Sequence, residues 1–467
     1  MLFNSYEFLF ALLPLTLVGY FLVFPKPWRH AWLTLCSFVF YGWWDYRYCG
    51  LLLLAITIDY FAGGRIAAAN DPAKKKRWLL VSICSDMGML GFFKYFDLGA
   101  RTINAAMSLL GAEHPVIPLL HLVLPVGISF YTFQSMSYSI DIYRGNARPA
   151  RNFIDFACYV SLFPQLVAGP IVRYHELDNQ LRQRTHTWAK AGAGITLFVL
   201  GLAKKVLLAD GVAPIADWGF AQATIGFAGA WSSLLAYTCQ IYFDFSGYSD
   251  MAVGLGLMLG FQFPQNFNSP YQSLSITEFW RRWHISLSSW LRDYLYVTLG
   301  GNRKGAIRTY VNLALVMLLG GMWHGAAWNF VIWGAMHGAA LVAERMLGLT
   351  GKDGSRRLPP VIAWLITFHF VCFAWIFFRS QTFESALDYF RVMFSFESFA
   401  LTMTPLVARM CVFGALTQII PDSVQERAEA WYDRTSIALK IALPIVVIWL
   451  IAAASPDGVP PFIYFQF

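Results

Sequence analysis

The stretch Leu318-Leu319-Gly320-Gly321-Met322-Trp323-His324-Gly325 ends a long apolar run with two glycines, an indole and one imidazole. A histidine inside membrane-spanning sequence is costly to place and indicates function. The neighbouring glycines let the backbone bend or let a ligand come close. We therefore expect His324 to be the working base of a membrane-embedded acyl-transfer site. The structural alternative is a histidine that bridges two helices through hydrogen bonds.

The composition predicts a protein that folds in lipid. Of the 467 residues, 57% are hydrophobic and 13% are charged, whereas about 25% are charged in a typical soluble domain. A soluble chain could not bury so much apolar surface. The net charge of +8 comes from Lys and Arg between apolar runs, as in cytoplasmic loops, and without a basic stripe we expect no nucleic acid as partner. The seven cysteines show no C-x-x-C spacing and no H-E-x-x-H is present, so we expect no metal site.

Apolar runs between basic loops predict an all-α polytopic membrane protein that forms one transmembrane domain, residues 1–467. No Lys or Arg precedes Lys26, so the positive-inside rule puts the N-terminus outside, and the order of basic loops puts the C-terminus outside too. One run, Leu51–Phe61, is short against the ~20 residues of a usual span. The other expected spans are Tyr6–Phe24, Trp32–Trp44, Trp78–Phe96, Leu119–Ile140, Ala191–Leu207, Trp231–Leu259, Tyr310–His324, Asn329–Ala343, Val361–Phe378, Met403–Ile420 and Ala438–Ala454.

Two further segments are expected not to cross the membrane. Residues 153–171 are apolar but contain two prolines and are flanked by basic residues, which favours a re-entrant hairpin around a cavity. Residues 275–296 mix Trp, Arg and Leu, which predicts one helix that is amphipathic and lies at the interface or dips into the site. Ser275 and Glu278 have the spacing of a capping box, and Glu278 and Arg282 are i,i+4 partners.

Acyl transfer to a hydroxyl suits these residues. A neutral imidazole, with an ordinary pKa near ~6.5, can take a proton from an alcohol. No G-x-S-x-G elbow is present, but a thioester donor is already activated, so a base and a positioned hydroxyl suffice. His284 is the second candidate, although an interfacial histidine explains it equally well. The polar and aromatic side chains expected to line a passage for substrate and donor are Tyr242, Asp244, Ser246, Arg281, Arg282, Trp283 and Trp323.

Arg281 and Arg282 are expected to steer a phosphate-bearing donor such as coenzyme A or a carrier's phosphopantetheine. Ordinary positive-inside anchoring is the alternative interpretation of both residues. We expect no bound cofactor, and acetyl-CoA or an acyl-carrier thioester as the acetyl donor.

On these residues the chain resembles the membrane-bound O-acyltransferase (MBOAT) family, and closely its branch for O-acetylation of alginate and cellulose. The resemblance implies a fold of about 10–12 transmembrane helices, with re-entrant and amphipathic helices around a central funnel. It implies that His324 matches the family's catalytic histidine and His284 its second characteristic polar position. The most specific matching stretches are Leu124–Tyr131, Pro164–Arg173, Tyr242–Gly254, Ile276–Lys304 and Gly320–Gly325.

The resemblance also implies a division of labour. The membrane protein takes acetyl from a cytoplasmic thioester and passes it across the bacterial inner membrane to a periplasmic SGNH-like acetyltransferase, in association with a polysaccharide synthase or secretion complex. We expect an acetyltransferase for a secreted exopolysaccharide, with His324 as catalytic base or transient acyl acceptor. The compact segment Pro421–Thr435 leaves cellulose and alginate both open. The alternatives are a relative for peptidoglycan O-acetylation or teichoic-acid D-alanylation, a non-catalytic acyl-group transporter, and a scaffold.

Overall fold

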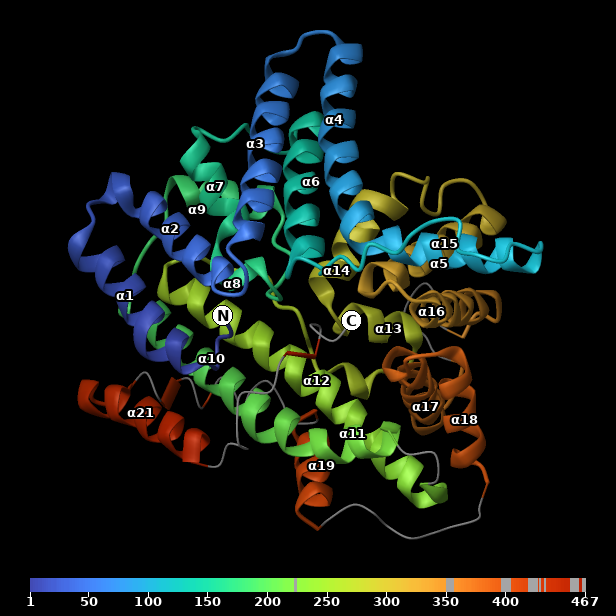
Figure 1. Ribbon diagram of the computed structural model, residues 1–467. Coiled ribbons are helices and arrows are strands. Elements are labelled where there is room, and N and C mark those ends of the chain that lie inside the picture. Colours follow the sequence, from blue (N-terminus) through green and yellow to red (C-terminus); the bar gives the residue numbers. More distant parts are fainter. Residues whose placement is uncertain are drawn as a thin grey trace. The chain divides into compact units, whose positions relative to one another are not determined.

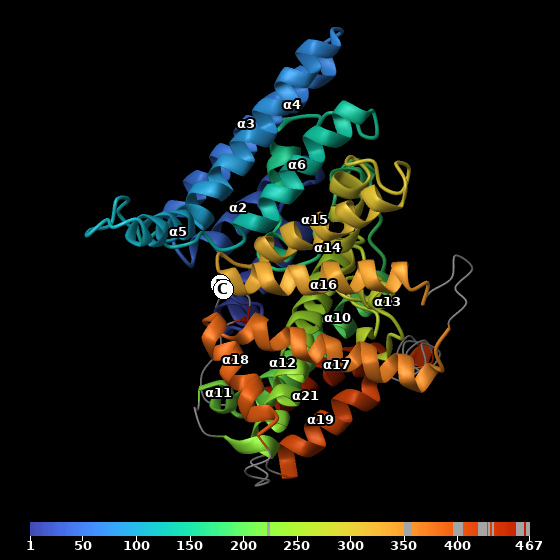
Figure 2. The same cartoon turned by 90° about the vertical axis from the view of Figure 1, so that its right-hand side faces the viewer.

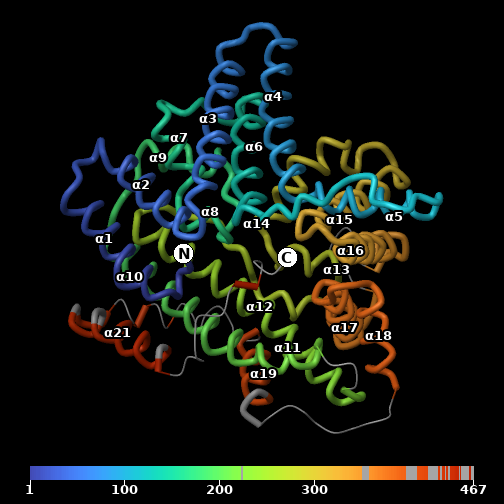
Figure 3. Tube along the Cα trace, in the orientation of Figure 1, coloured from blue at the N-terminus to red at the C-terminus, as the bar shows by residue number. Residues whose placement is uncertain are grey.

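The computed structural model describes residues 1–221, 225–349, 357–395, 405–418, 427, 430–431, 434–453 and 462–463 (Figures 1 and 3). These residues form helices and loops and contain no strand. The chain separates into two compact units. Unit 1 comprises Met1–His186 with Leu259–Phe263, and unit 2 comprises Thr187–Met258 with Pro264–Phe467.

Several described helices are long and apolar enough to cross a membrane. Two shorter apolar helices, Phe8–Val23 and Ala442–Ile451, accompany them. The predicted all-α multi-pass membrane protein is therefore confirmed, while the total of 10–12 spans and the single domain stay predictions. The five long helices found among the described residues are Arg47–Ala68, Pro72–Leu109, Trp188–Ala221, Ala306–His324 and Pro360–Arg379.

The centre of unit 1 is a bundle of three helices, α3 (Arg47–Ala68), α4 (Pro72–Leu90) and α6 (Ile128–Arg144), which lie side by side (Figures 1 and 2). The expectation of a short span at Leu51–Phe61 is wrong, because α3 extends beyond this run at both ends and has 22 residues. The predicted start of a helix at residue 119 is also wrong. Gly127 before α6 has a left-handed backbone with φ 75°, which interrupts a helix and favours glycine.

The other helices of unit 1 are mostly short. The apolar segment 153–171 is broken, as predicted, because its first helix ends at Ser161 and the next contains Pro164 near its start. Whether this segment re-enters the membrane stays a prediction. These helices are η1 (Phe8–Leu12), α1 (Leu13–Val18), η2 (Gly19–Val23), η3 (Lys26–Trp28), α2 (Arg29–Gly42), η4 (Gly91–Tyr95), α5 (Phe96–Leu109), α7 (Phe153–Ser161), α8 (Phe163–Leu166) and α9 (Tyr174–Arg182).

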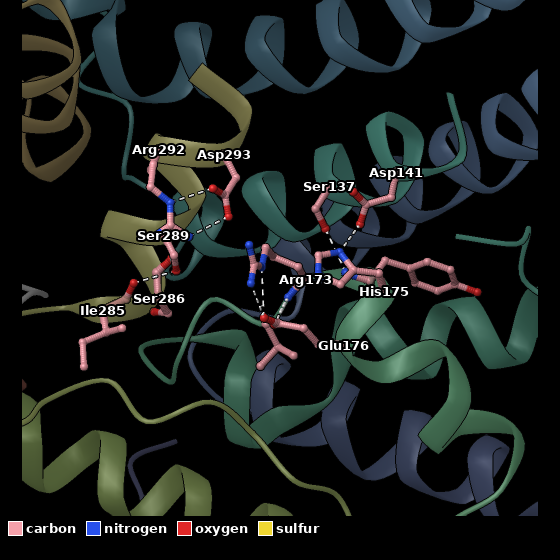
Figure 4. A network of polar contacts seen from close by, with 12 residues as sticks. Ser137, Asp141, Arg173, His175, Glu176, Ile285, Ser286, Ser289, Arg292 and Asp293 are labelled. Carbon is pink, nitrogen blue, oxygen red and sulfur yellow. Dashed lines mark hydrogen bonds and ion pairs between the residues drawn. The ribbon is translucent and has the colours of Figure 1, made fainter. Parts of the chain in front are cut away.

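Charged side chains hold the start of α9 (Figure 4). Arg173 Nη2 pairs with Glu176 Oε1 at 2.6 Å, and the Arg173 backbone N–H donates to the same carboxylate at 2.8 Å. His175 Nδ1 pairs with Asp141 Oδ2 at 2.8 Å. The second contact ties α9 to the end of α6, so this polar helix is fixed to the three-helix bundle of unit 1.

Unit 2 contains the long helices that position the candidate site. Among its described residues, α15 (Ala306–His324) and α16 (Trp328–Met346) lie side by side (Figure 2). The expected spans from Met403 and Ala438 correspond to α19 (Pro405–Gln418) and α21 (Ile437–Ala453), although most of Pro421–Thr435 lies outside the described residues. The remaining elements are α10 (Trp188–Ala203), η5 (Lys204–Ala209), α11 (Asp210–Ala221), α12 (Gly226–Met258), η6 (Pro270–Gln272), α13 (Ile276–Arg282), α14 (Ile285–Trp290), η7 (Leu291–Tyr296), α17 (Pro360–Arg379), α18 (Phe383–Met393), α19 (Pro405–Gln418) and α21 (Ile437–Ala453).

Candidate active site

His324 is the last residue of α15, and only 4% of its surface is exposed. Its imidazole is enclosed by aromatic rings from three helices. The centroid distances are 5.0 Å to Trp323, 5.1 Å to Trp333 of α16 and 5.3 Å to Phe378 of α17. The end of α15 therefore places a titratable group among indoles and a phenyl ring, with little contact with bulk water.

The glycines next to His324 let α15 and α16 pack closely, whereas the sequence led us to expect that they let a ligand come close. A Cβ on Gly321 would lie 2.2 Å from the Phe330 carbonyl oxygen, and one on Gly325 would lie 2.0 Å from the Phe330 ring. Gly334 of α16 is equally tight against Met317 of α15, at 2.4 Å. Small residues of this kind let membrane helices approach closely. The expectation that Gly321 and Gly325 leave space for a ligand is wrong, because α16 fills that space.

His284 lies at a break in the chain between α13 and α14, with a left-handed backbone (φ 43°, ψ 54°). The expected single helix over residues 275–296 is therefore wrong. The reason is that the loop after α12 replaces helical hydrogen bonds at the break. The Asn268 backbone N–H donates to the Arg282 carbonyl oxygen, and the Ile285 N–H donates to the Asn266 carbonyl oxygen, each at 2.9 Å.

The predicted start of α13 is confirmed. The Ser275 hydroxyl accepts from the Glu278 backbone N–H at 3.0 Å, and the Glu278 carboxylate accepts from the Leu274 backbone N–H at 3.0 Å. Glu278 also pairs with Arg282 at 3.1 Å, as the i,i+4 spacing predicts. This cap and ion pair fix α13 and hence the position at which the chain turns into His284.

Asn266, which the sequence did not suggest as a site residue, holds the His284 ring. Its Oδ1 lies 3.1 Å from His284 Nδ1 and also accepts from the Ser286 backbone N–H at 3.2 Å and the Ser286 hydroxyl at 2.9 Å. Its Nδ2 donates to the Ser249 hydroxyl at 3.0 Å. Because Asn266 Oδ1 can only accept, His284 Nδ1 must carry a proton.

In its neutral form, the His284 ring therefore presents the lone pair of its Nε2 atom. This ring is fully buried, and among the described residues Nε2 has no hydrogen-bond partner. Phe245 of α12 packs edge-on against it at 4.7 Å between centroids. The sequence of this loop gave no signal for Asn266, because an asparagine in a loop is ordinary.

The structure brings the two candidate histidines together across forty residues of sequence. The centroids of the His284 and His324 rings are 6.4 Å apart, and the Trp323 ring lies 5.9 Å from His284 and 5.0 Å from His324. Trp323 was expected in the passage, and its ring lies beside both imidazoles. These three side chains form the centre of the candidate site.

Trp283 and Tyr242 form an aromatic layer next to this centre. Trp283 is fully buried, with its ring 5.0 Å from Trp375 and 6.2 Å from Tyr242. Tyr242 is 5% exposed and also contacts the Tyr271 ring at 5.5 Å. Both residues are therefore placed to pack beside the site rather than to face bulk solvent.

The carboxylate of Asp244 is occupied by other groups. Its Oδ1 pairs with Lys205 at 2.6 Å, and its Oδ2 accepts from the Ile463 backbone N–H at 2.7 Å. Lys205 also pairs with Asp210 at 2.6 Å, and all three charged side chains are at most 5% exposed. The structure thus places Asp244 in a buried ionic network, and Ser246 nearby on α12 is buried without a hydrogen-bond partner among the described residues.

The two arginines before the break have different surroundings. The Arg281 side chain is exposed. Arg282 is paired with Glu278 and donates to the Asn268 carbonyl oxygen at 3.2 Å. Further along, Arg292 pairs with its neighbour Asp293 at 2.7 Å in η7 (Figure 4). Arg281 is therefore the more available of the two predicted arginines for an anionic ligand.

A third buried histidine lies behind the site. The Trp280 Nε1–H donates to His337 Nδ1 at 3.2 Å, and the His337 ring is 4.8 Å from the Trp333 ring. His337 also packs at 5.3 Å against Phe370, which lines an apolar cavity of about 210 Å³ between α13, α16 and α17. His324 and His337 both lie against the Trp333 ring, at 5.1 Å and 4.8 Å, because the chain breaks between α15 and α16.

The described residues contain no group of three or more His, Cys, Asp or Glu side chains that could hold a metal ion. The arrangement instead offers two imidazoles in an aromatic enclosure. Such a pair can exchange a proton with a substrate hydroxyl and is suited to acid–base chemistry.

Comparison with known proteins agrees with this chemistry. The model of MBOAT, the membrane-bound O-acyltransferase family, matches residues 146–387. The chain belongs to this family. The MBOAT match includes both histidines of the site, and the protein is a membrane-bound O-acyltransferase.

Individual relatives of this MBOAT protein are similar along most of the chain. A probable alginate O-acetylase, AlgI, of Pseudomonas putida is 44% identical to this chain, and the similarity extends over the full length of both proteins. The corresponding protein of Azotobacter vinelandii is 48% identical over 86% of this chain and 80% of its own length. A peptidoglycan O-acetyltransferase of Helicobacter pylori is 40% identical over 86% of this chain and 81% of its own length.

Proposed function

We propose that this MBOAT protein transfers acetyl groups from a cytoplasmic thioester across the bacterial inner membrane for the O-acetylation of a secreted polysaccharide. The observation that carries the proposal is the buried pair of imidazoles, His284 and His324, with centroids 6.4 Å apart in a chain 44% identical to a probable alginate O-acetylase over its full length. Alginate or a related exopolysaccharide is the polymer that this similarity favours.

In the proposed reaction, His324 takes the proton of an acceptor hydroxyl. The hydroxyl oxygen attacks the carbonyl carbon of the thioester, a carbon–oxygen bond forms and the carbon–sulfur bond breaks. The thiolate leaves with the electron pair and receives the proton from the His324 imidazolium. His284 accepts the hydrogen bond of the acceptor hydroxyl at Nε2 when the acceptor first binds, because Asn266 holds the proton on Nδ1, and the hydroxyl then turns its one proton to His324 for the reaction.

The apolar cavity between α13, α16 and α17 is the proposed entrance for the donor. Its volume of about 210 Å³ lies below the ~300–1,000 Å³ of pockets for compact drug-sized ligands, so it suits a narrow, flexible thioester arm. At one end the Arg357 guanidinium donates to the Leu347 carbonyl oxygen at 3.1 Å and places a positive charge where the donor's phosphates would lie. At the other end, Phe370 and His337 lead toward the indole of Trp333 beside His324.

A bulky substitution in the cavity tests this route. Ala340 of α16 lines the cavity, and its neighbour Ala339 is exposed on the same helix. We expect Ala340→Trp to raise KM for acetyl-CoA at least tenfold, because an indole would fill much of the cavity. The control Ala339→Trp should leave KM within twofold. Equal KM values for both variants in reconstituted vesicles would exclude this cavity as the entrance.

The acceptor is proposed to be a periplasmic SGNH-like acetyltransferase, which then modifies the polymer beside its synthase or secretion complex. A strain lacking this chain should lose acetyl groups on the secreted polysaccharide, and the wild-type protein but not His324→Ala should restore them. Both termini are proposed to lie in the periplasm, which labelling of terminal cysteine tags would test.

Peptidoglycan O-acetylation is the second candidate, because the Helicobacter pylori enzyme is 40% identical over most of both chains. Loss of acetyl groups from muropeptides, with the polysaccharide unchanged, would favour this candidate and overturn the first. A transporter or a scaffold would release no coenzyme A from acetyl-CoA in vesicles that contain only this chain and an acceptor alcohol. Measured release of coenzyme A would exclude both.

A further inference from the structure

Unit 1 contains two buried carboxyl groups that take no part in the proposed acyl transfer. Asp59 lies on α3 and Asp86 on α4, and neither has any exposed surface. Both helices belong to segments long and apolar enough to cross a membrane. We propose that Asp59 and Asp86 form a proton-binding site in which the two carboxyl groups share one exchangeable proton.

The two carboxyl groups face each other across the α3–α4 contact, within hydrogen-bonding range. Ser82, one turn before Asp86 on α4, donates to Asp59 Oδ1 at 2.6 Å. The Ser82 hydroxyl also lies 2.8 Å from the Ser139 hydroxyl of α6. Since Ser82 has a single hydroxyl proton, it donates in one of these two contacts and accepts in the other. All three helices of the bundle thus meet at this pair.

The Ser135 hydroxyl of α6 also lies beside Asp59, but the remaining carboxyl oxygens form no hydrogen bond among the described residues. Asp59 Oδ2 and both oxygens of Asp86 are buried without a hydrogen-bond partner among the described residues. None of the ion pairs in the described chain includes either carboxyl group. The titratable side chains of α6 that face the pair are the neutral phenols Tyr131 and Tyr138, and from α2 and α7, which also pack on α3, no charged group interacts with it.

Two ionised carboxylates without a cation would be very costly in this environment. The cost falls if one proton lies between them, because one carboxyl group then donates to the other and the mutual repulsion disappears. A proton also fits the available space, since the oxygens without partners have essentially no surface accessible to a water-sized probe. A hydrated ion or a metal ion would need room and several further oxygen ligands.

A row of hydroxyls along α6 gives the proton a route of exchange. Ser129, Thr132, Ser135 and Ser139 follow one another every three or four residues and are all buried. Residues at this spacing share one face of a helix. The Thr132 and Ser135 hydroxyls have no hydrogen-bond partner among the described residues, and Lys94 donates to Ser129 at 3.3 Å. Hydroxyls can both donate and accept, so rotation of these side chains would pass a proton along the row to Ser82, which bonds to Asp59.

Infrared spectroscopy of the full chain in liposomes tests the proposal. Protein with aspartate labelled at the carboxyl carbon should show, at neutral pH, a protonated carboxyl band that corresponds to one proton per chain. Asp59→Asn and Asp86→Asn should each lose this band, because the asparagine amide supplies the N–H that replaces the shared proton. The control Asp388→Asn, at a position whose side chain is 64% exposed, should keep it.

Transfer of the wild-type protein into D₂O should shift the band, because the proton is exchangeable. An absent wild-type band, its survival in both asparagine variants, or a band insensitive to D₂O would each overturn the proposal. A band that appears only after removal of Na⁺ would also overturn it, in favour of a sodium site. If an asparagine variant fails to fold, Ser82→Ala should still shift the band, because Asp59 loses its hydroxyl donor, and an unchanged band would contradict the assignment.

Discussion

Replacement of Asn266 by alanine should separate the geometry of the site from its stability. In the native protein, Asn266 Oδ1 accepts from three donors, one of which is His284 Nδ1. Alanine removes the acceptor that fixes the tautomer and rotation of the His284 ring. Loss of one such buried hydrogen bond is worth ~1–3 kcal/mol, which corresponds to a ~5- to 150-fold decrease in kcat if the bond acts in the transition state.

The assay is the release of coenzyme A from acetyl-CoA by protein reconstituted in liposomes, with kcat and KM measured separately. We expect Asn266→Ala to lower kcat and leave the KM for acetyl-CoA nearly unchanged, because the residue contacts His284 and not the proposed donor cavity. Nitrogen NMR of labelled histidine should show the Nδ1–H tautomer of His284 in the wild type and a mixture of tautomers in the variant.

Two controls make this prediction sharp. Asn268 lies two residues further along the same loop with an exposed side chain, and its backbone N–H makes the hydrogen bond, so Asn268→Ala should keep full activity. Asn266→Asp keeps an acceptor for Nδ1–H and should retain more activity than alanine. If Asn266→Ala folds with unchanged kcat, or if it changes only the melting temperature, the assignment of Asn266 as the positioning residue is refuted.

Two further predictions concern packing and pH. Gly321→Ala would force a Cβ to within 2.2 Å of a carbonyl oxygen on α16, so it should cost ~1–3 kcal/mol of stability. This cost should appear as a lower melting temperature in detergent. The control Gly88→Ala, where a Cβ would meet no atom within 4 Å, should leave the melting temperature unchanged. A carboxylate partner raises the pKa of His175 above its ordinary 6.5, so this contact stabilises fully below pH 6.5 and is lost as the pH rises through the raised pKa. The melting temperature should fall over that range, and His175→Gln should flatten the fall.

The sequence was sufficient to predict membership of the MBOAT family and an O-acyltransferase activity. An imidazole is unusual inside apolar sequence, and the cost of burying it makes His324 informative. The capping pattern of Ser275 and Glu278 is local, so the helix start that it predicts does not depend on tertiary contacts. These features could be interpreted from spacing alone.

Other features depended on contacts between distant segments. The break at His284 results from backbone hydrogen bonds to Asn266 and Asn268, which no periodicity within residues 275–296 can reveal. The tight fit of Gly321 is likewise determined by α16. Glycine permits both an open turn and a close helix contact, so its presence alone could not distinguish the two.

The ion-pair partner of Asp244 is a further feature that the sequence did not reveal. A carboxylate within apolar sequence predicts either a functional group or a buried ion pair, and the partner Lys205 lies 39 positions earlier in the chain. Lys205 stands next to Lys204 in apolar sequence, and its ion pair with Asp244 supplies the physical reason.

The most direct test of the account is turnover by the His324→Ala protein. Purified chain in liposomes, with labelled acetyl-CoA and an acceptor alcohol, should release coenzyme A, and His324→Ala should reduce this release to the rate of empty vesicles while its melting temperature stays close to that of the wild type. His369→Ala, which removes an imidazole bonded only to a carbonyl of its own helix at 2.7 Å, should keep the wild-type rate. Continued release of coenzyme A by folded His324→Ala protein would contradict the central claim.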